Sequence, residues 1–159
     1  MQLPLPQPLK PSQLMLFEAA PARQPSRPEK TTPGSPHAGG AEPFSEVSLR
    51  GGADQCLFLL APMLRELSQG NDGRWLTLVA PPANLSHGWL REAGLNRERI
   101  LLLQPSREQE ASELVCEALR LGRSHTVVSW LSPVNRSTRQ RLLQAARTGQ
   151  AQSLNIRLG

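Results

Sequence analysis

The chain has 159 residues, of which 38% are hydrophobic, so its length and composition suit one domain with a tail. No apolar run is long enough to cross a bilayer, and prolines near the start exclude a secretory signal pattern, so we expect a cytoplasmic protein with no membrane partner. The net charge is +5 and no lysine follows Lys30, so the predicted domain draws its positive charge from arginine.

Residues 1–43 form the first distinct segment, with ten of the fifteen prolines and little apolar periodicity. Such a segment cannot bury enough surface to offset the entropy lost on ordering. We therefore predict a disordered N-terminal tail, followed by a single α/β domain over residues 44–159. Within the tail, Leu14–Phe17 is a small apolar cluster that is either a docking motif or a weakly packed part of the tail.

The predicted domain begins with a strand and a long helix. Phe44–Arg50 alternates apolar and polar residues, as an edge strand does. Asp54 is placed to cap a helix that runs to about Ser68, with leucines at helical spacing. Pro62 lies inside this pattern and predicts a kink or a late start of the regular helix.

A strand, a short helix and a second strand follow. Trp75–Ala80 is a short apolar run that two prolines close, which is typical of a strand buried on both faces. Ser86 can cap a short helix that Gly94 ends, and Ile100–Leu103 reads as the next strand. Connections of this kind are right-handed, so the two strands are expected to be parallel.

The rest of the domain continues the alternation of helices and strands. Ser106 and Gln109 match a capping box for a helix that Gly122 ends, and Thr126–Leu131 reads as a third buried strand. The last two predicted elements are a helix from Pro133 to Gly149 and an edge strand over Ser153–Leu158.

This alternation predicts an α/β domain, with a mostly parallel sheet of about five strands and helices on both faces. Ligands of such sheets bind beyond the carboxyl ends of the strands. None of the strand-to-helix loops has the glycine-rich pattern with a lysine that binds phosphates, and no Gly-x-Gly-x-x-Gly occurs. We therefore expect the P-loop to be absent and no nucleotide cofactor to bind.

Groups for acid–base chemistry are sparse. Asp54 and Asp72 are the only aspartates of the predicted domain, and His87 and His125 have no acidic neighbour in sequence. A set of Ser129, His125 and Asp54 can be drawn, but a chain of this size allows such a set by chance. The two cysteines lack metal-ligand spacing. The sequence thus predicts neither an enzyme nor a metal site.

Two kinds of partner remain open, the first being nucleic acid. From Pro133 onward the chain has five arginines and no acidic residue, so this segment could follow a phosphate backbone. The lack of a recognition-helix motif, the absence of tyrosine and the few aromatic residues argue against this interpretation.

The second kind of partner is another protein, with Trp89 at the centre of the contact. Its short helix offers Leu90 to the core, while Arg74, Arg97 and Arg99 lie in turns at the ends of the same unit. Tryptophan and arginine are enriched at energetic hot spots of interfaces. In the alternative interpretation, Trp89 packs its helix onto the sheet and the arginines form a solvated rim. The other two tryptophans, Trp75 and Trp130, are predicted to lie in the core.

Six motifs between residues 44 and 149 occur in a familiar order. They are Phe44-Ser-Glu-Val, the leucine-rich helix 57–67, Arg74-Trp75, Leu85-Ser-His-Gly-Trp-Leu-Arg-Glu-Ala-Gly-Leu, Ala118-Leu-Arg-Leu-Gly and Val127-Val-Ser-Trp-Leu. Their order and spacing resemble those of the bacterial SulA family of cell-division inhibitors. The resemblance implies a RecA-like fold without the nucleotide loop, in agreement with the missing phosphate-binding loop.

The resemblance also implies a function. A protein of this family would be made in the SOS response to DNA damage, and would bind the tubulin-like division protein FtsZ. It would block the head-to-tail polymerisation of FtsZ, and thereby its GTPase activity, so that septation waits for repair. The residues carried over to the FtsZ contact are Arg74, Trp89 and Arg99, the last usually a lysine in relatives, with Leu90, Leu95 and Arg97 beside them.

Relatives self-associate, so a homodimer through an edge strand is expected, with Phe44–Arg50 and Ser153–Leu158 as candidates. The chain departs from the family in its proline-rich tail. It also stops at the last strand, without the tail that a protease reads in relatives, so turnover by that protease is in doubt. The alternative functions are a nucleic-acid binder or a degenerate RecA-like accessory protein of the DNA-damage response that retains ATP.

Overall fold

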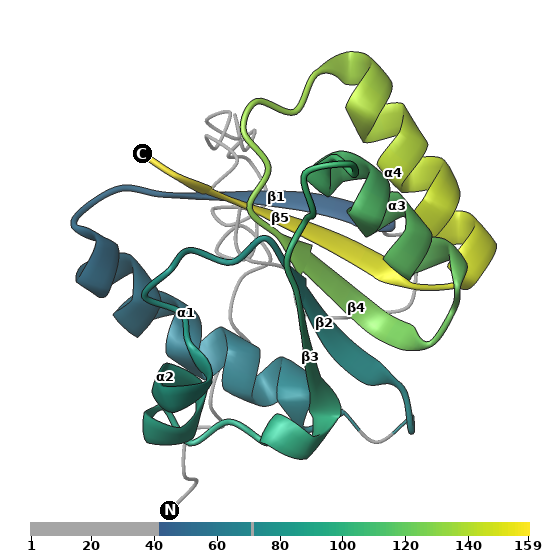
Figure 1. Ribbon diagram of the computed structural model, residues 1–159. Helices are drawn as coiled ribbons and strands as arrows, with labels where there is room; N and C mark the ends of the chain where they lie inside the picture. Colours follow the sequence, from purple (N-terminus) through teal and green to yellow (C-terminus); the bar gives the residue numbers. More distant parts are fainter. Residues whose placement is uncertain (1–41, 71) are drawn as a thin grey trace, which may run out of the picture. The chain divides into compact units, whose positions relative to one another are not determined.

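The computed structural model describes residues 42–70 and 72–159 of the chain (Figure 1). The prediction of a disordered tail, with its Leu14–Phe17 cluster, therefore falls almost wholly outside the described residues. Strands and helices alternate along the described part. In chain order they are β1 (Phe44–Leu49), α1 (Ala53–Ser68), β2 (Trp75–Val79), α2 (His87–Glu92), the 3-10 helix η2 (Arg97–Arg99), β3 (Ile100–Leu103), α3 (Ala111–Arg120), β4 (Ser124–Ser129), α4 (Arg136–Gly149) and β5 (Gln152–Leu158).

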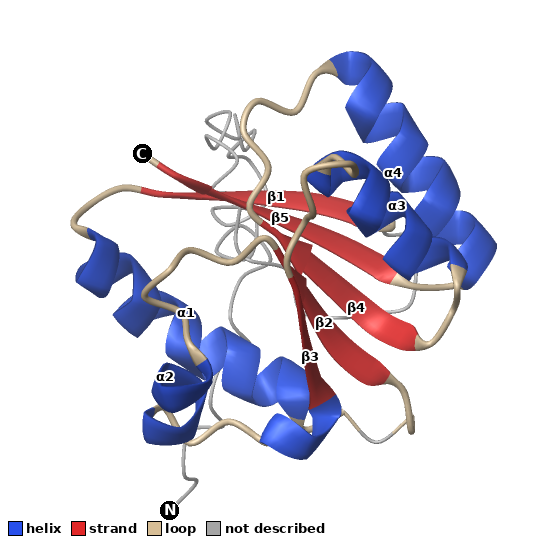
Figure 2. Cartoon of the chain, viewed as in Figure 1, coloured by secondary structure: helices blue, strands red, loops and turns tan. Residues whose placement is uncertain are grey.

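The strands form one sheet in the order β1-β5-β4-β2-β3, and every neighbouring pair is parallel. Figure 2 shows α1 and α2 on one side of this sheet and α3 and α4 on the other. The predicted α/β class, the parallel sheet and the helices on both faces are confirmed. None of the helices in the described part is long and apolar enough to cross a membrane.

The sheet separates two apolar cores. Along β2, Leu76 and Leu78 belong to the core beneath α1 and α2, whereas Val79 belongs to the core beneath α3 and α4. All three are fully buried, so most of β2 is covered on both faces, as its continuous apolar sequence predicts. Removal of this apolar surface from water is the main contribution to the stability of the domain.

The position of β5 contradicts the prediction of an edge strand over Ser153–Leu158. This strand lies between β1 and β4. The prediction took Ser153 and Asn155 as solvent-facing, but both are fully buried. Asn155 satisfies its amide inside the protein: its Oδ1 accepts hydrogen bonds from Leu131 N at 2.8 Å and Ser129 Oγ at 3.1 Å. The edge strands are β1 and β3, so β5 offers no free edge for self-association.

Two helices begin later than their sequences predict. For α3, the capping box of Ser106 and Gln109 does not form; the helix begins at Ala111, and the Gln109 side chain donates a hydrogen bond to Glu117 at 2.9 Å instead. For α4, the first residue is Arg136. Its cap is the Asn135 side chain, which accepts a hydrogen bond from the backbone N–H of Thr138 at 2.8 Å.

The backbones of α3 and α4 approach closely at one point. Gly149, the last residue of α4, is buried against Leu119 of α3. A Cβ atom at this position would overlap the Leu119 carbonyl oxygen and would come within 2.7 Å of the carbonyl carbon. Only glycine therefore fits where the two helices meet.

Candidate protein-interaction surface

The predicted partner-binding residues come from the amino ends of two adjacent strands and from the segment between those strands, which holds α2, a turn and η2. Arg74 immediately precedes β2, and Arg99 immediately precedes β3. In the sheet, Leu76 lies opposite Ile100, so both arginines belong to the same end of the sheet. Residues that are far apart in sequence are thus brought to one edge of the domain.

The α2–η2 segment is held in place by α1. Ser86 caps α2 by accepting a hydrogen bond from Trp89 N at 3.2 Å, as predicted. At the other end of α2, the guanidinium of Arg65 donates two hydrogen bonds to the carbonyl oxygen of Ala93, at 2.6 and 3.2 Å. The chain then turns at Gly94, whose φ of +70° is readily available only to glycine. The segment is therefore fixed relative to the sheet.

The apolar members of the predicted site face inward. Leu90 and Leu95 are buried in the core beneath α1 and α2, so they position the segment and do not form its outer surface. Trp89 is partly buried and packs against the same core. Trp89 thus packs on the core, as one interpretation predicts, and keeps part of its surface accessible, as the other requires.

The basic members of the predicted site differ from one another. Arg74 is engaged: its Nε lies 2.9 Å from a carboxylate oxygen of Asp72, and one of its terminal nitrogens donates to the Gln150 carbonyl oxygen at 2.8 Å. Arg97 and Arg99 are exposed and make no ion pair within the described part of the chain. Arg74 therefore ties β2 to the end of α4, whereas Arg97 and Arg99 are available to a partner.

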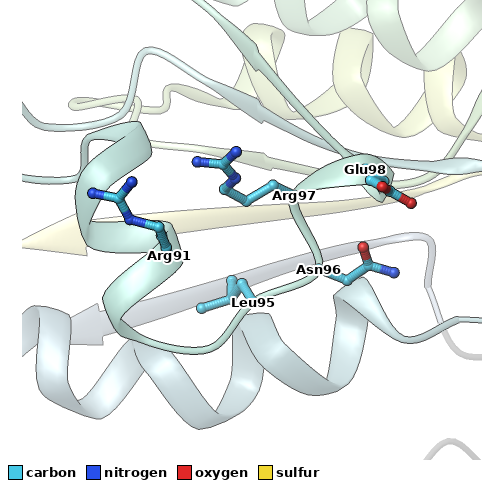
Figure 3. A pocket seen from close by; sticks show the side chains of 5 residues that line it. All are labelled: Arg91, Leu95, Asn96, Arg97 and Glu98. Carbon is cyan, nitrogen blue, oxygen red and sulfur yellow. The ribbon is translucent and has the colours of Figure 1, made fainter.

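Arg91 belongs to the same surface, although the sequence did not single it out. Figure 3 shows the guanidinium groups of Arg91 and Arg97 on the same side of the turn, with Leu95 between them. They border a pocket of about 380 Å³. Its lining residues are Arg91, Leu95, Asn96, Arg97 and Glu98. A signal for Arg91 was present in the sequence, because it directly follows Leu90, which was expected in the core. Neighbouring residues of a helix point in different directions, so Arg91 could be expected on an outer face.

Of the two tryptophans predicted to be core residues, Trp130 packs against a core and Trp75 does not. Trp75 is 42% exposed, because the first residue of β2 projects beyond the helices that cover the rest of the strand. Trp130 follows β4 and packs, partly buried, against the core beneath α1 and α2, as predicted. Its indole N–H is buried without a hydrogen-bond partner among the described residues. The prediction for Trp75 was wrong, and a large aromatic surface is exposed as a result.

The catalytic set that could be drawn from the sequence does not assemble. His125 and Ser129 lie four residues apart along β4, a separation of about 13 Å in a strand. Asp54 is in the first turn of α1, which packs on the side of the sheet that α2 covers. The hydroxyl of Ser129 donates to Asn155, at 3.1 Å. No common reaction site joins these three residues.

His125 is partly buried, and its Nδ1 lies 2.9 Å from Thr126 Oγ1. Burial lowers the pKa of His125 below 6.5, and the charge of Arg74 adds to this effect, while Asp72 opposes it. The unfolded chain therefore binds a proton first as the pH falls, so the domain loses stability as the pH drops from above 6.5 through the folded-state pKa.

We expect the His125→Gln substitution to remove this component of the pH dependence. Urea unfolding between about pH 5 and 8 measures it as a smaller drop in the free energy of unfolding towards acid pH. The control is His87→Gln, at an exposed histidine at the start of α2, which should leave the drop unchanged. An equal drop in His125→Gln and in the unsubstituted protein would show that another group is responsible.

The C-terminal arginines do not form one free basic surface. Arg139 lies over the ring of Phe44, 5.2 Å from its centre, and 3.4 Å from a carboxylate oxygen of Glu42. Arg157 lies 3.5 Å from a carboxylate oxygen of Glu46. Two of the five arginines that motivated nucleic-acid binding thus have partners within the domain.

Known proteins are similar to this chain in sequence and in structure. A family model described as cell division inhibitor SulA matches residues 44–153. SulA of Pseudomonas aeruginosa is 68% identical over 116 residues, which cover 73% of this chain and 72% of that protein. SulA of Yersinia pestis is 32% identical over 99 residues, 62% of this chain and 58% of that protein. The crystal structure of SulA from Pseudomonas aeruginosa matches with a TM-score of 0.71 and 68% identity, covering 74% of this chain and 98% of that chain.

Proposed function

Because the chain belongs to the SulA family of cell division inhibitors, we propose that it stops division by binding FtsZ and blocking its head-to-tail polymerisation. The family membership supports the inhibition of division. The partner, the cytoplasmic location and synthesis in the SOS response are part of the proposal. All three rest on the resemblance of the sequence motifs to the family. The surface described above supports the choice of a protein partner.

The proposed mechanism requires no chemical step. A filament grows by contact between unlike faces of successive subunits, so a protein that covers one of these faces prevents addition of the next subunit. In a tubulin-like filament the neighbouring subunit completes the GTP site, so the same cover also suppresses hydrolysis. The inhibitor is expected to act stoichiometrically, with each molecule removing about one FtsZ subunit from assembly.

The observation that carries the proposal is the group of exposed arginines on a fixed α2–η2 segment. Arg91 and Arg97 flank one pocket, and Arg99 follows Arg97 after Glu98, which also lines the pocket. Within the described residues, none of the three makes an ion pair. Arginine forms forked hydrogen bonds with carboxylates and is frequent at interface hot spots, so this group suits an acidic protein surface.

The test is sedimentation of polymerised FtsZ at increasing concentrations of this protein. We expect the pelleted fraction to fall in proportion to the inhibitor added, and the double variant Arg97→Ala/Arg99→Ala to bind about tenfold more weakly or worse. The matched control is Arg50→Ala/Arg136→Ala, which removes two exposed arginines that follow the carboxyl ends of β1 and β4, at the other end of the sheet from Arg99. Loss of filaments at a small fraction of the FtsZ concentration would contradict the covering mechanism.

A further inference from the structure

The end of the sheet that carries Arg74 and Arg99 also exposes large apolar side chains. Trp75 of β2 is 42% exposed, Leu101 of β3 is 43% exposed, and Leu121 at the end of α3 is 64% exposed. Residues of this size are usually removed from water, and exposed apolar groups that gather in one place mark interaction sites.

Trp75 and Leu101 lie on one face of the sheet. Side chains alternate along a strand, so Trp75 and Thr77 share the face of Val79, which belongs to the core beneath α3 and α4. Leu101 is the direct partner of Thr77 in the β2–β3 pairing. Trp75 and Leu101 are therefore diagonal neighbours on the side of the sheet covered by α3 and α4, within reach of a long or aromatic side chain.

Leu121 lies at the end of α3, two residues before the backbone contact with Trp75. It continues the helical conformation of α3 and follows Leu114 by seven residues, so both lie on one side of the helix. The other side of α3 is occupied by α4, which touches Leu119 and Gly122 through Gly149. Just beyond Leu121, the carbonyl oxygen of Arg123 accepts a hydrogen bond from Trp75 N at 2.9 Å.

We propose that Trp75, Leu101 and Leu121 form a docking patch for an apolar protein surface with an acidic border. The proposal rests on the proposed function and assigns this surface to FtsZ, as an extension of the arginine-bearing segment around the β3 edge of the sheet. Trp75 is its centre, because a large, rigid, half-exposed indole supplies the most contact area at the lowest entropy cost.

The charge around the patch determines the kind of partner. The residues that flank the three apolar side chains in sequence include four arginines and two carboxylates. These are Arg74, Arg99, Arg120, Arg123, Asp72 and Glu98. A second copy of this chain, docked through the same face, would set this excess of positive charge against itself. A partner with carboxylates around an apolar surface gains attraction in place of that repulsion.

The test uses the full chain and purified FtsZ, with binding measured by titration of labelled FtsZ. We expect Trp75→Ala to weaken binding about thirtyfold, the loss typical of a central hot spot. Leu121→Glu should weaken binding more than Leu121→Arg, because glutamate repels an acidic border and arginine does not. The matched control is Leu158→Glu, at an apolar residue that is 40% exposed at the carboxyl end of β5, whereas Trp75 lies at the amino end of β2 in the parallel sheet; its binding should be unchanged.

The outcomes separate the two proposals. If the unsubstituted chain does not bind FtsZ, the proposed function fails and the docking patch fails with it. If it binds and the Trp75 and Leu121 variants bind equally well, only the docking patch is wrong. Urea unfolding identifies a variant that fails to fold; should Trp75→Ala do so, the order of the two Leu121 variants decides. A change confined to self-association in sedimentation velocity would assign the patch to a second copy and overturn the proposal.

Discussion

We expect Gly149→Ala to destabilise the domain by about 3 kcal/mol or more, a large part of the stability of a small domain. The new methyl group would occupy the space of the Leu119 carbonyl oxygen, and the nearby Gly122 backbone leaves little room on the other side. Both neighbours are main-chain atoms, which cannot rotate away as a side chain can. The substitution therefore has to separate α3 from α4, and it would open the core that Leu119 and Leu142 fill.

Chemical unfolding followed by circular dichroism measures this effect. The matched control is Gly88→Ala in α2, where the nearest atom to the new Cβ is Ser86 Oγ at 3.5 Å, an ordinary contact. Alanine is the better helix former by roughly 0.5–1 kcal/mol, so this control should be neutral or slightly stabilising. If Gly149→Ala unfolded at the same urea concentration as the control, the close approach of the two helices would be refuted.

The second large effect is expected from Asn155→Leu, which should cost about 3 kcal/mol. Asn155 is fully buried in β5, and its Nδ2 donates to the carbonyl oxygen of Leu131 at 3.0 Å and to Glu46 at 3.2 Å. Its Oδ1 accepts from Leu131 N and Ser129 Oγ. Leucine has a similar volume but no polar atoms, so the backbone groups of Leu131 would be buried without partners.

Gln152→Leu is the matched control, since it makes the same kind of change on β5 at an exposed position. It should alter the free energy of unfolding by less than about 0.5 kcal/mol. Equilibrium unfolding of both variants in urea gives the comparison. A difference between them of less than about 1 kcal/mol would mean that the polar groups around Asn155 find other partners.

Local sequence patterns predicted the elements well, because the signals that define them are local. Ser86 and Gly94 delimit α2 through a side-chain cap and a left-handed turn, and the apolar run Ile100–Leu103 coincides with β3. The order of the strands is different. The place of β5 between β1 and β4 depends on contacts between distant segments, and its buried polar residues look the same in sequence as those of a half-exposed strand.

In the interaction surface too, some features could be predicted from local sequence and others could not. The basic character of Arg97 and Arg99 can be read from their turn, and both are exposed. The burial of a tryptophan depends on which helices cover it, and no local pattern contains that information. Trp89 was expected at the surface or in the core and is partly buried, whereas Trp75, expected in the core, lies at the uncovered start of β2.

The pairing of β1 with β5 has a consequence for how the protein is made. β1 leaves the ribosome first among the described strands, yet its partner in the sheet is translated about a hundred residues later. Until Gln152–Leu158 emerges, β1 has no strand to bind and β4 lacks its neighbour on that side. A nascent chain halted within α4 would therefore carry two open strand edges, on β1 and β4, that are paired in the finished sheet, and unpaired edges favour aggregation and proteolysis.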